Sequence, residues 1–266
     1  MTTTQSEKAK NPLLERARLP GETFVLPSLG LFYSKDQVEC ENGEIYIYPM
    51  TTLEQILLSS PDKLFSGDAI NDVFKRCCPQ IKKPLEMLSK DVDFVLSVLR
   101  KISFGENSEV SYIHDCKDAK VHSYAINLGK FIENAKHIDP TKIKSEYEKN
   151  LSNGQQIKLG PPRFLPTLKL YQVAMENSNK EESPEDIVNT VLESIATMII
   201  EVDEISDQKM IKEWLAIISP EMIEEIKNYV INASTWGSDY TTKTKCQDCG
   251  KEIDISSEIN PVTFFF

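Results

Sequence analysis

Residues 241–255 read Thr-Thr-Lys-Thr-Lys-Cys-Gln-Asp-Cys-Gly-Lys-Glu-Ile-Asp-Ile, and they are the most informative part of the sequence. A Cys-x-x-Cys-Gly motif between two short alternating segments is typical of a zinc knuckle at the tip of a β-hairpin. The tight turn brings the sulfurs of Cys246 and Cys249 together, and Gly250 frees the backbone to curl beneath a metal. Because tetrahedral zinc takes four ligands, this hairpin supplies half of a site.

A weak internal repeat predicts the other half. Each copy has a helix, an aromatic residue followed by glycine, and a hairpin with cysteine at its tip. The cysteine lies eleven residues after the glycine in the first copy (Cys116) and nine residues after it in the second (Cys246). The repeat predicts Cys116 as the third ligand and either His114 or His122 as the fourth, since thiolate and neutral imidazole are both zinc donors.

The Cys-x-x-Cys motif has two other interpretations, a relic of a lost metal site and a redox pair. A thioredoxin-type pair lies at a helix N-terminus after a strand, and the residues around Cys246 do not offer that pattern. A zinc site here would be structural and closed, and one ion would tie two distant hairpins together. The remaining cysteines are predicted to be core thiols: Cys40, Cys77 and Cys78.

The composition narrows the class of protein. The 266 residues carry a formal charge of −11, and the pI is about 4.9. This excess of acidic residues argues against a protein that coats nucleic acid and against one that binds an anionic membrane surface, because phosphate neutralisation needs clustered Lys and Arg. No apolar run approaches the roughly 18 residues of a membrane span. The polar first ten residues lack a signal-peptide core. Six cysteines in a chain of this length favour a reducing cytoplasm over a secreted disulfide framework.

Periodicity predicts an α+β protein with a mostly helical core and short β-hairpins, one at the C-terminus and a related one near residues 109–126. Thr51-x-x-Glu54 is a capping box, and Ser183-Pro184 and Ser219-Pro220 are helix starts. Helices are expected over residues 51–58, 68–77, 91–102, 167–175, 183–201, 207–218 and 219–233. Strands are expected over residues 44–48, 109–113, 121–126 and 154–159, with an extended, turn-rich segment over 24–33.

The expected organisation is a flexible segment over residues 1–18 and a single α+β domain over residues 19–266. That domain would have two weakly related halves, about 19–140 and 141–266. No phosphate-binding loop, dinucleotide fingerprint, nucleophile elbow or zinc-protease motif occurs, so no catalytic or cofactor-binding residue is predicted. The chain ends in Phe264, Phe265 and Phe266, which would either pack back on the domain or dock into a partner.

The order of these features resembles a known family. The matching segments are the N-terminal segment 26–33, residues 49–54 after a hairpin strand, the helix that ends in Cys78, the helix and glycine over 93–105, and the knuckle 246–250 with its aromatic chain end. Together they are similar to the T4 baseplate family, the baseplate hub proteins of T4-like contractile-tailed bacteriophages. The resemblance covers roughly residues 20–266.

The resemblance implies a non-enzymatic role, either as a hub component or as a hub assembly factor. Its partners would be other baseplate hub and tail proteins, with no nucleic acid, membrane or small-molecule substrate. Its locations would be the host cytoplasm during assembly and the virion tail baseplate. The family pattern carries two cysteines in the first knuckle, whereas this chain has Cys116 alone, with Ile113 at one partner position. That departure implies a mixed site or no metal.

Two other classes of function stay open on the sequence. One is a zinc-knuckle adaptor that contacts a nucleic-acid-associated complex through protein partners. It predicts affinity for nucleic acid that falls steeply with salt. The other is an enzyme with an unrecognised site, which predicts a polar cleft with convergent titratable groups.

Overall fold

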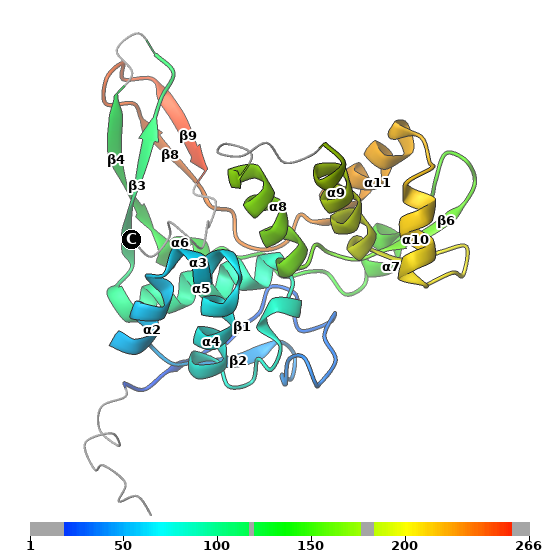
Figure 1. Ribbon diagram of the computed structural model, residues 1–266. Coiled ribbons are helices and arrows are strands. Elements are labelled where there is room, and N and C mark those ends of the chain that lie inside the picture. Colours follow the sequence, from blue (N-terminus) through cyan, green and yellow to red (C-terminus); the bar gives the residue numbers. More distant parts are fainter. Residues whose placement is uncertain (1–18, 117–119, 177–183, 257–266) are drawn as a thin grey trace, which may run out of the picture.

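The computed structural model describes residues 19–116, 120–176 and 184–256, and it is an α+β structure of helices and small antiparallel sheets (Figure 1). This confirms the expected fold class. None of the described helices is long and apolar enough to cross a membrane. The predicted mobile segment 1–18 and the aromatic end Phe264–Phe266 lie outside the described residues.

A first hydrophobic core is built around one long central helix, α5. The core buries the side chains of Val92, Val95, Leu96 and Leu99 along one side of this helix. Its elements are β1 (Glu22–Val25), β2 (Glu44–Ile47), α2 (Thr52–Leu58), α3 (Pro61–Phe65), α4 (Asp68–Cys77), η1 (Pro84–Glu86), α5 (Ser89–Phe104) and the N-terminal end of α8 (Phe164–Glu176). The capping box at Thr51 and Glu54 is present at the start of α2, as predicted.

A second core lies on the right of Figure 1, around a three-stranded sheet. Its apolar side chains alternate along the strands, so that Ile157, Leu159 and Ile199 are buried together against Ile211 and Ile226 of two helices. The elements are α7 (Ile143–Tyr147), β5 (Glu148–Asn150), β6 (Gln156–Leu159), α9 (Pro184–Met198), β7 (Ile199–Val202), α10 (Gln208–Leu215) and α11 (Pro220–Ala233).

Two sequence expectations are wrong in detail. The helix expected to reach Glu201 ends at Met198, and Ile199–Val202 instead forms β7 beside β6. Ile-Ile-Glu-Val is rich in β-branched residues, which favour a strand once a neighbouring strand is available. The segment expected to be extended and turn-rich over 24–33 has the predicted turns, with Gly30 at a φ of +74°, but its strand ends already at Val25. Cys77 and Cys78 are buried core thiols as predicted, while Cys40 is half-buried.

Two hairpins stand beside each other on the left of Figure 1 and form a projection that we call the double hairpin. The first consists of β3 (Asn107–Ile113) and β4 (Val121–Asn127), followed by α6 (Leu128–Glu133), and the second of β8 (Thr241–Lys245) and β9 (Glu252–Ser256). A small cluster of buried side chains, separate from both cores, packs between them: Tyr124, Cys246, Ile253 and Ile255.

A half-buried lysine, Lys90, fixes the start of the second hairpin. The Lys90 ammonium donates hydrogen bonds to the carbonyl oxygens of Ser234 (2.5 Å) and Trp236 (2.6 Å), just after α11. It also lies 5.5 Å from the centre of the Trp236 ring. Gly237 then pairs with Lys136, whose backbone follows α6. The chain therefore leaves the second core and returns to the first hairpin along a fixed path.

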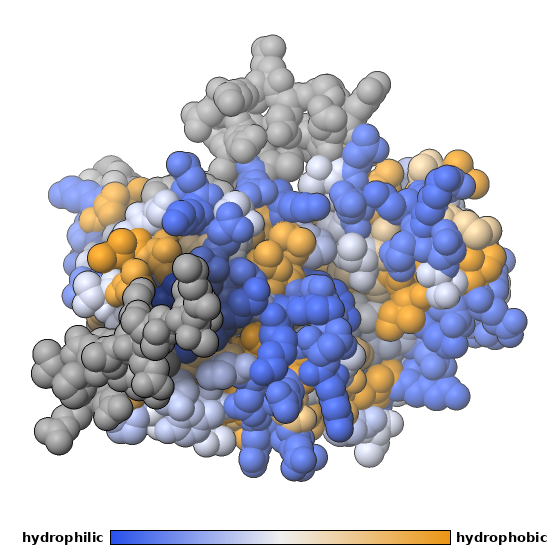
Figure 2. Space-filling model, turned by 60° about the horizontal axis from the view of Figure 1, so that its bottom comes forward, coloured by the Kyte–Doolittle hydropathy of each residue, from blue (hydrophilic) through white to orange (hydrophobic). Residues whose placement is uncertain are grey.

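The underside of the molecule, turned forward in Figure 2, is mostly hydrophilic with separate hydrophobic patches. This pattern agrees with the strongly acidic composition. Single exposed apolar residues are ordinary on protein surfaces, so none of these patches marks a site by itself.

Candidate metal centre

The tip of the double hairpin brings a histidine and a cysteine from one part of the chain to two cysteines from another. His114 and Cys116 follow β3, Cys246 comes directly after β8, and Cys249 lies in the turn to β9. One possible ligand atom from each residue lies within 4.8 Å of those of the other three. The Cys249 Sγ to His114 Nδ1 distance is 3.4 Å. The cluster could hold a metal ion.

Local backbone geometry shapes the second half of this cluster. The Cys246 N–H donates to the carbonyl of Lys251 at 2.8 Å, and the Gly250 N–H donates to the carbonyl of Cys246 at 2.9 Å. Gly250 has a φ of +71°, a left-handed conformation that glycine adopts without steric cost. The sequence therefore places glycine where the turn must curl back beneath the sulfurs.

The surroundings of Cys246 favour its thiolate. The backbone N–H of Cys249 is the largest influence, and with further hydrogen bonds from the Asp248 backbone and His114 it lowers the pKa of the Cys246 thiol to about 6. Burial of the side chain acts in the opposite direction. Since thiolate is the form that binds metals, the turn prepares Cys246 as a ligand.

Gln247 and Asp248, which lie between Cys246 and Cys249, hold this turn against the first hairpin. Gln247 donates from its backbone to Tyr124 Oη (3.4 Å) and from its side chain to the carbonyl of Ser123 (3.2 Å). The carboxylate of Asp248 accepts from the Lys120 N–H at 3.2 Å and lies 2.8 Å from His122 Nε2. These contacts set the two halves of the cluster at a fixed separation.

The donor set suits zinc. With bonds of about 2.3 Å to sulfur and 2.0 Å to nitrogen, a tetrahedral zinc separates its ligand atoms by roughly 3.5–3.8 Å. The four residues can therefore reach one ion with small side-chain adjustments. Three thiols and one imidazole do not suit Mg²⁺ or Ca²⁺, which prefer oxygen ligands. With four protein ligands, the site would have no open position for a substrate.

The structure brings together four of the residues that the sequence suggested as ligands, Cys246, Cys249, Cys116 and His114. It places the other suggested histidine, His122, beside Asp248 and outside the cluster. Sequence reasoning missed the contacts of Gln247 and Asp248 with the first hairpin. No sequence signal could have revealed them, because each joins side chains or backbone of segments more than a hundred residues apart.

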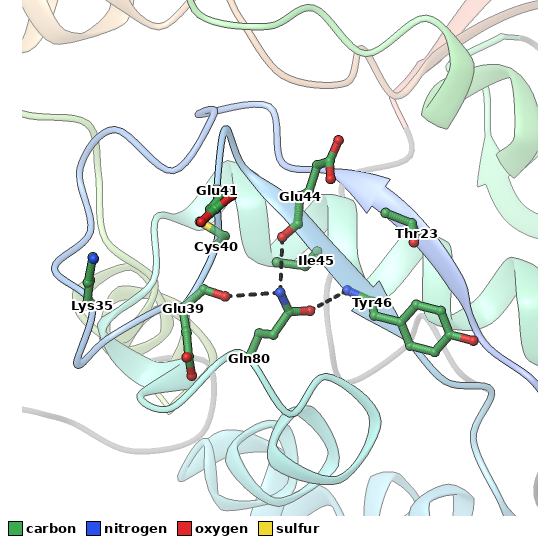
Figure 3. A pocket seen from close by; sticks show the side chains of 9 residues that line it. All are labelled: Thr23, Lys35, Glu39, Cys40, Glu41, Glu44, Ile45, Tyr46 and Gln80. Atoms are coloured by element: carbon green, nitrogen blue, oxygen red, sulfur yellow. Dashed lines mark hydrogen bonds between the residues drawn. The ribbon is translucent and has the colours of Figure 1, made fainter.

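Apart from the cluster, a surface hollow lies beside β2 and is lined mostly by acidic and polar residues (Figure 3). The amide of Gln80 occupies its centre, where its Nε2 donates to the carbonyls of Glu39 (3.0 Å) and Glu44 (3.2 Å) and its Oε1 accepts from the Tyr46 N–H (2.6 Å). Every polar atom of this amide therefore binds backbone. We interpret the contact as one that holds the loop before β2, and the hollow as structural.

A comparison with known protein families matches most of this chain. Residues 34–266, nearly the whole chain, match the sequence model of the family described as T4 bacteriophage base plate protein. Neither the curated proteins nor the solved structures contain a match to the chain. The cluster of His114, Cys116, Cys246 and Cys249 and both hairpins lie within the matched residues. The expected resemblance is therefore confirmed: the chain belongs to the T4 bacteriophage base plate protein family.

Proposed function

We propose that this protein is a non-enzymatic component of the phage tail baseplate hub, or a factor that assists hub assembly, and that it acts by protein–protein interaction. The family match over residues 34–266 carries this proposal, because it spans both cores and the double hairpin. On this proposal the protein is present in the host cytoplasm during assembly. A hub component would then stay in the virion tail baseplate, and an assembly factor would leave.

The cluster of four possible metal ligands has a structural role in this proposal. His114, Cys116, Cys246 and Cys249 would bind one zinc ion and fix the two hairpin tips to each other. Closed four-ligand coordination supports a structural rather than a catalytic role. A small apolar cluster and the contacts of Gln247 and Asp248 join the two hairpins, and a metal would add much of the free energy that holds them together.

The aromatic chain end and the domain organisation complete the proposal. Phe264, Phe265 and Phe266 would dock into a hub or tail protein, because exposed aromatic side chains are common anchors of protein interfaces. Residues 19–266 would form one domain with two weakly related halves, about 19–140 and 141–266. The packing of Tyr33 against both cores supports a single domain.

The test is a tagged pull-down from the infected native host, with mass spectrometry of every retained protein, repeated on purified finished particles. Recovery of tail hub proteins from the lysate is the expected result. Presence in particles would then identify a hub component, and absence would identify an assembly factor. Recovery of host or replication complexes without tail proteins would overturn the proposal in favour of the zinc-knuckle adaptor.

A shortened chain separates the roles of the aromatic end and the metal. Deletion of residues 264–266 is expected to lower the recovery of hub proteins at least several-fold while the zinc content stays unchanged. Equal recovery with the full and shortened chains would contradict the docking role of the three phenylalanines. Loss of zinc from the shortened chain would show instead that the deletion disturbs the fold.

A further inference from the structure

A small apolar groove, here called the Trp214 groove, opens between the turn after β7 and helix α10, on the side of the molecule away from the double hairpin (Figure 1). Its volume is about 150 Å³. The buried side chains of Val202 and Ile211 line its base, and Ile205, Met210 and Trp214 line its sides. Met210 is 52% exposed and Ile205 is 43% exposed. The groove therefore presents clustered apolar surface to solvent.

The polar side chains in the groove are already engaged with each other. Gln155 Oε1 accepts from the indole N–H of Trp214 at 3.1 Å, and Gln155 Nε2 donates to the Asp203 carboxylate at 2.9 Å. The other Asp203 oxygen accepts from the Gln156 N–H at 2.8 Å. A polar ligand would find few free hydrogen-bonding groups here, so the groove suits an apolar group.

The rim of the groove is acidic. Asp203 lines the groove, and Asp207 lies beside the lining residue Met210; both are exposed. Glu204 lines a separate hollow with Lys158. In the part of the chain that the structure describes, neither Asp203 nor Asp207 forms a salt bridge, and Asp207 instead accepts from the Met210 N–H at the start of α10. Carboxylates beside an apolar groove attract a cationic partner and repel an anionic one.

We propose that the Trp214 groove binds one large apolar side chain, such as leucine or methionine, carried on a protein segment with lysine or arginine on both sides. The volume matches one such side chain, the lining matches its chemistry, and the rim matches the charge of the flanking residues. The inference requires neither the metal nor the hub role, so it stands or fails independently of the proposed function.

The backbone of the rim supplies a precise variant. Asp203 and Glu204 have φ values of +47° and +67°, in a turn closed by paired hydrogen bonds between Val202 and Ile205. Such a two-residue turn normally contains glycine or asparagine, because other side chains are strained in this conformation. Asp203→Asn should therefore suit the turn, keep an oxygen that accepts from the Gln156 N–H and remove a rim charge, so that the variant folds but binds less well.

Two tryptophans make the experiment specific. The indole N–H of Trp214 lies at the groove, whereas that of Trp236 donates to Tyr147 Oη in the second core and serves as the internal reference. The full-length ¹⁵N-labelled protein would be titrated with a capped peptide of one leucine between lysine pairs. Matched peptides would carry glutamates in place of the lysines, or serine in place of the leucine. Trp214→Phe assigns the two signals.

The expected result is a saturable shift of the Trp214 signal alone, with affinity for the lysine–leucine peptide about tenfold or more above that for either matched peptide. Met210→Ser and Asp203→Asn should each weaken binding about threefold to tenfold. Ile231→Ser, an exposed change on α11 outside the groove lining, should leave it unchanged.

Three outcomes would overturn the proposal. One is the absence of a saturable Trp214 shift, and another is equal affinity for the three peptides. The third is a Trp214 shift that depends on protein concentration without peptide, because the groove would then be occupied by a second copy of this chain.

Discussion

At the scale of single residues, Cys246 is the most constrained member of the cluster. It is buried, its backbone closes the turn at both ends, and neighbouring N–H groups lower the pKa of its thiol to about 6. Loss of one ligand from a four-ligand site leaves the ion with incomplete coordination. The remaining three residues then bind it far less tightly.

Cys246→Ser is expected to lose the bound zinc and to unfold at a lower urea concentration than the wild-type protein. Cys40→Ser, which changes a half-buried cysteine outside the cluster, is the matched control and should keep its zinc. Elemental analysis of freshly purified proteins and urea unfolding curves measure the two effects. A Cys246→Ser protein with full zinc content would exclude this residue as a ligand.

A second prediction concerns the buried carboxyl of Asp91 at the start of α5. Burial raises the pKa of Asp91 to about 6, despite hydrogen bonds from the Ser28 backbone (3.1 Å), the Ser28 hydroxyl and Tyr33 Oη (2.7 Å). Because this pKa is higher in the folded state than in the unfolded chain, Asp91 stabilises the fold fully below about pH 4. That contribution is lost as the pH rises through 6.

Asp91→Asn should therefore remove a fall in unfolding free energy of roughly 2–3 kcal/mol between pH 4 and pH 7. The variant also alters the hydrogen bonds to Ser28, so the change with pH is compared rather than the absolute stability. Urea unfolding of wild type, Asp91→Asn and the exposed control Asp72→Asn at several pH values measures it. Identical pH profiles for wild type and Asp91→Asn would refute the role of this carboxyl.

At the scale of elements, the double hairpin depends least on the main cores. Each of its sheets has two strands, and isolated two-stranded ribbons are marginally stable in water. Four buried side chains form the cluster that joins the sheets, whereas each core contains many more. The hairpins should therefore respond to the loss of the metal before the rest of the molecule does.

Removal of the metal with a chelator is expected to speed amide hydrogen exchange in β3, β4, β8 and β9 while α5 and α11 remain protected. The reason is that the proposed ion would join the tips of the hairpins, and its four ligands lie outside both cores. Exchange followed by mass spectrometry, with and without chelator, resolves these peptides. Uniform acceleration throughout the chain would indicate that the metal supports the whole fold instead.

Lys90 provides a further prediction for the connection between α11 and the second hairpin. Lys90→Met keeps much of the apolar stem but leaves the carbonyls of Ser234 and Trp236 without their donor. The expected loss is about 2 kcal/mol of unfolding free energy, because hydrogen bonds to a charged group are lost at a partly buried site. Thermal and urea unfolding measure it, with exposed Lys75→Met as control. A loss no larger than that of the control would show that Lys90 is dispensable.

Local signals in the sequence account for much of the fold. The helix over Asp68–Cys77 has its predicted bounds, since its apolar residues and the following proline are all local features. Ile199–Val202 could not be assigned correctly, because its strand exists only by pairing with β6. The same limit applies to the candidate site. The Cys-x-x-Cys spacing is local, but the choice between His114 and His122 depends on how two distant hairpins meet.

At the scale of the whole molecule, the cluster joins positions that lie far apart in the chain. His114 and Cys249 are 135 residues apart, and most of the second core lies between them. A metal at this point would close a long loop and restrict the unfolded chain more than a local knuckle would. We therefore expect one ion to hold both hairpins together.

The most direct test is zinc X-ray absorption spectroscopy on the freshly purified full-length protein, with the zinc content measured on the same sample. The proposed four-ligand site predicts close to one zinc per chain, with three sulfur ligands at about 2.3 Å and one nitrogen ligand at about 2.0 Å. A stable, folded protein without metal, or a zinc shell of oxygen ligands, would contradict it.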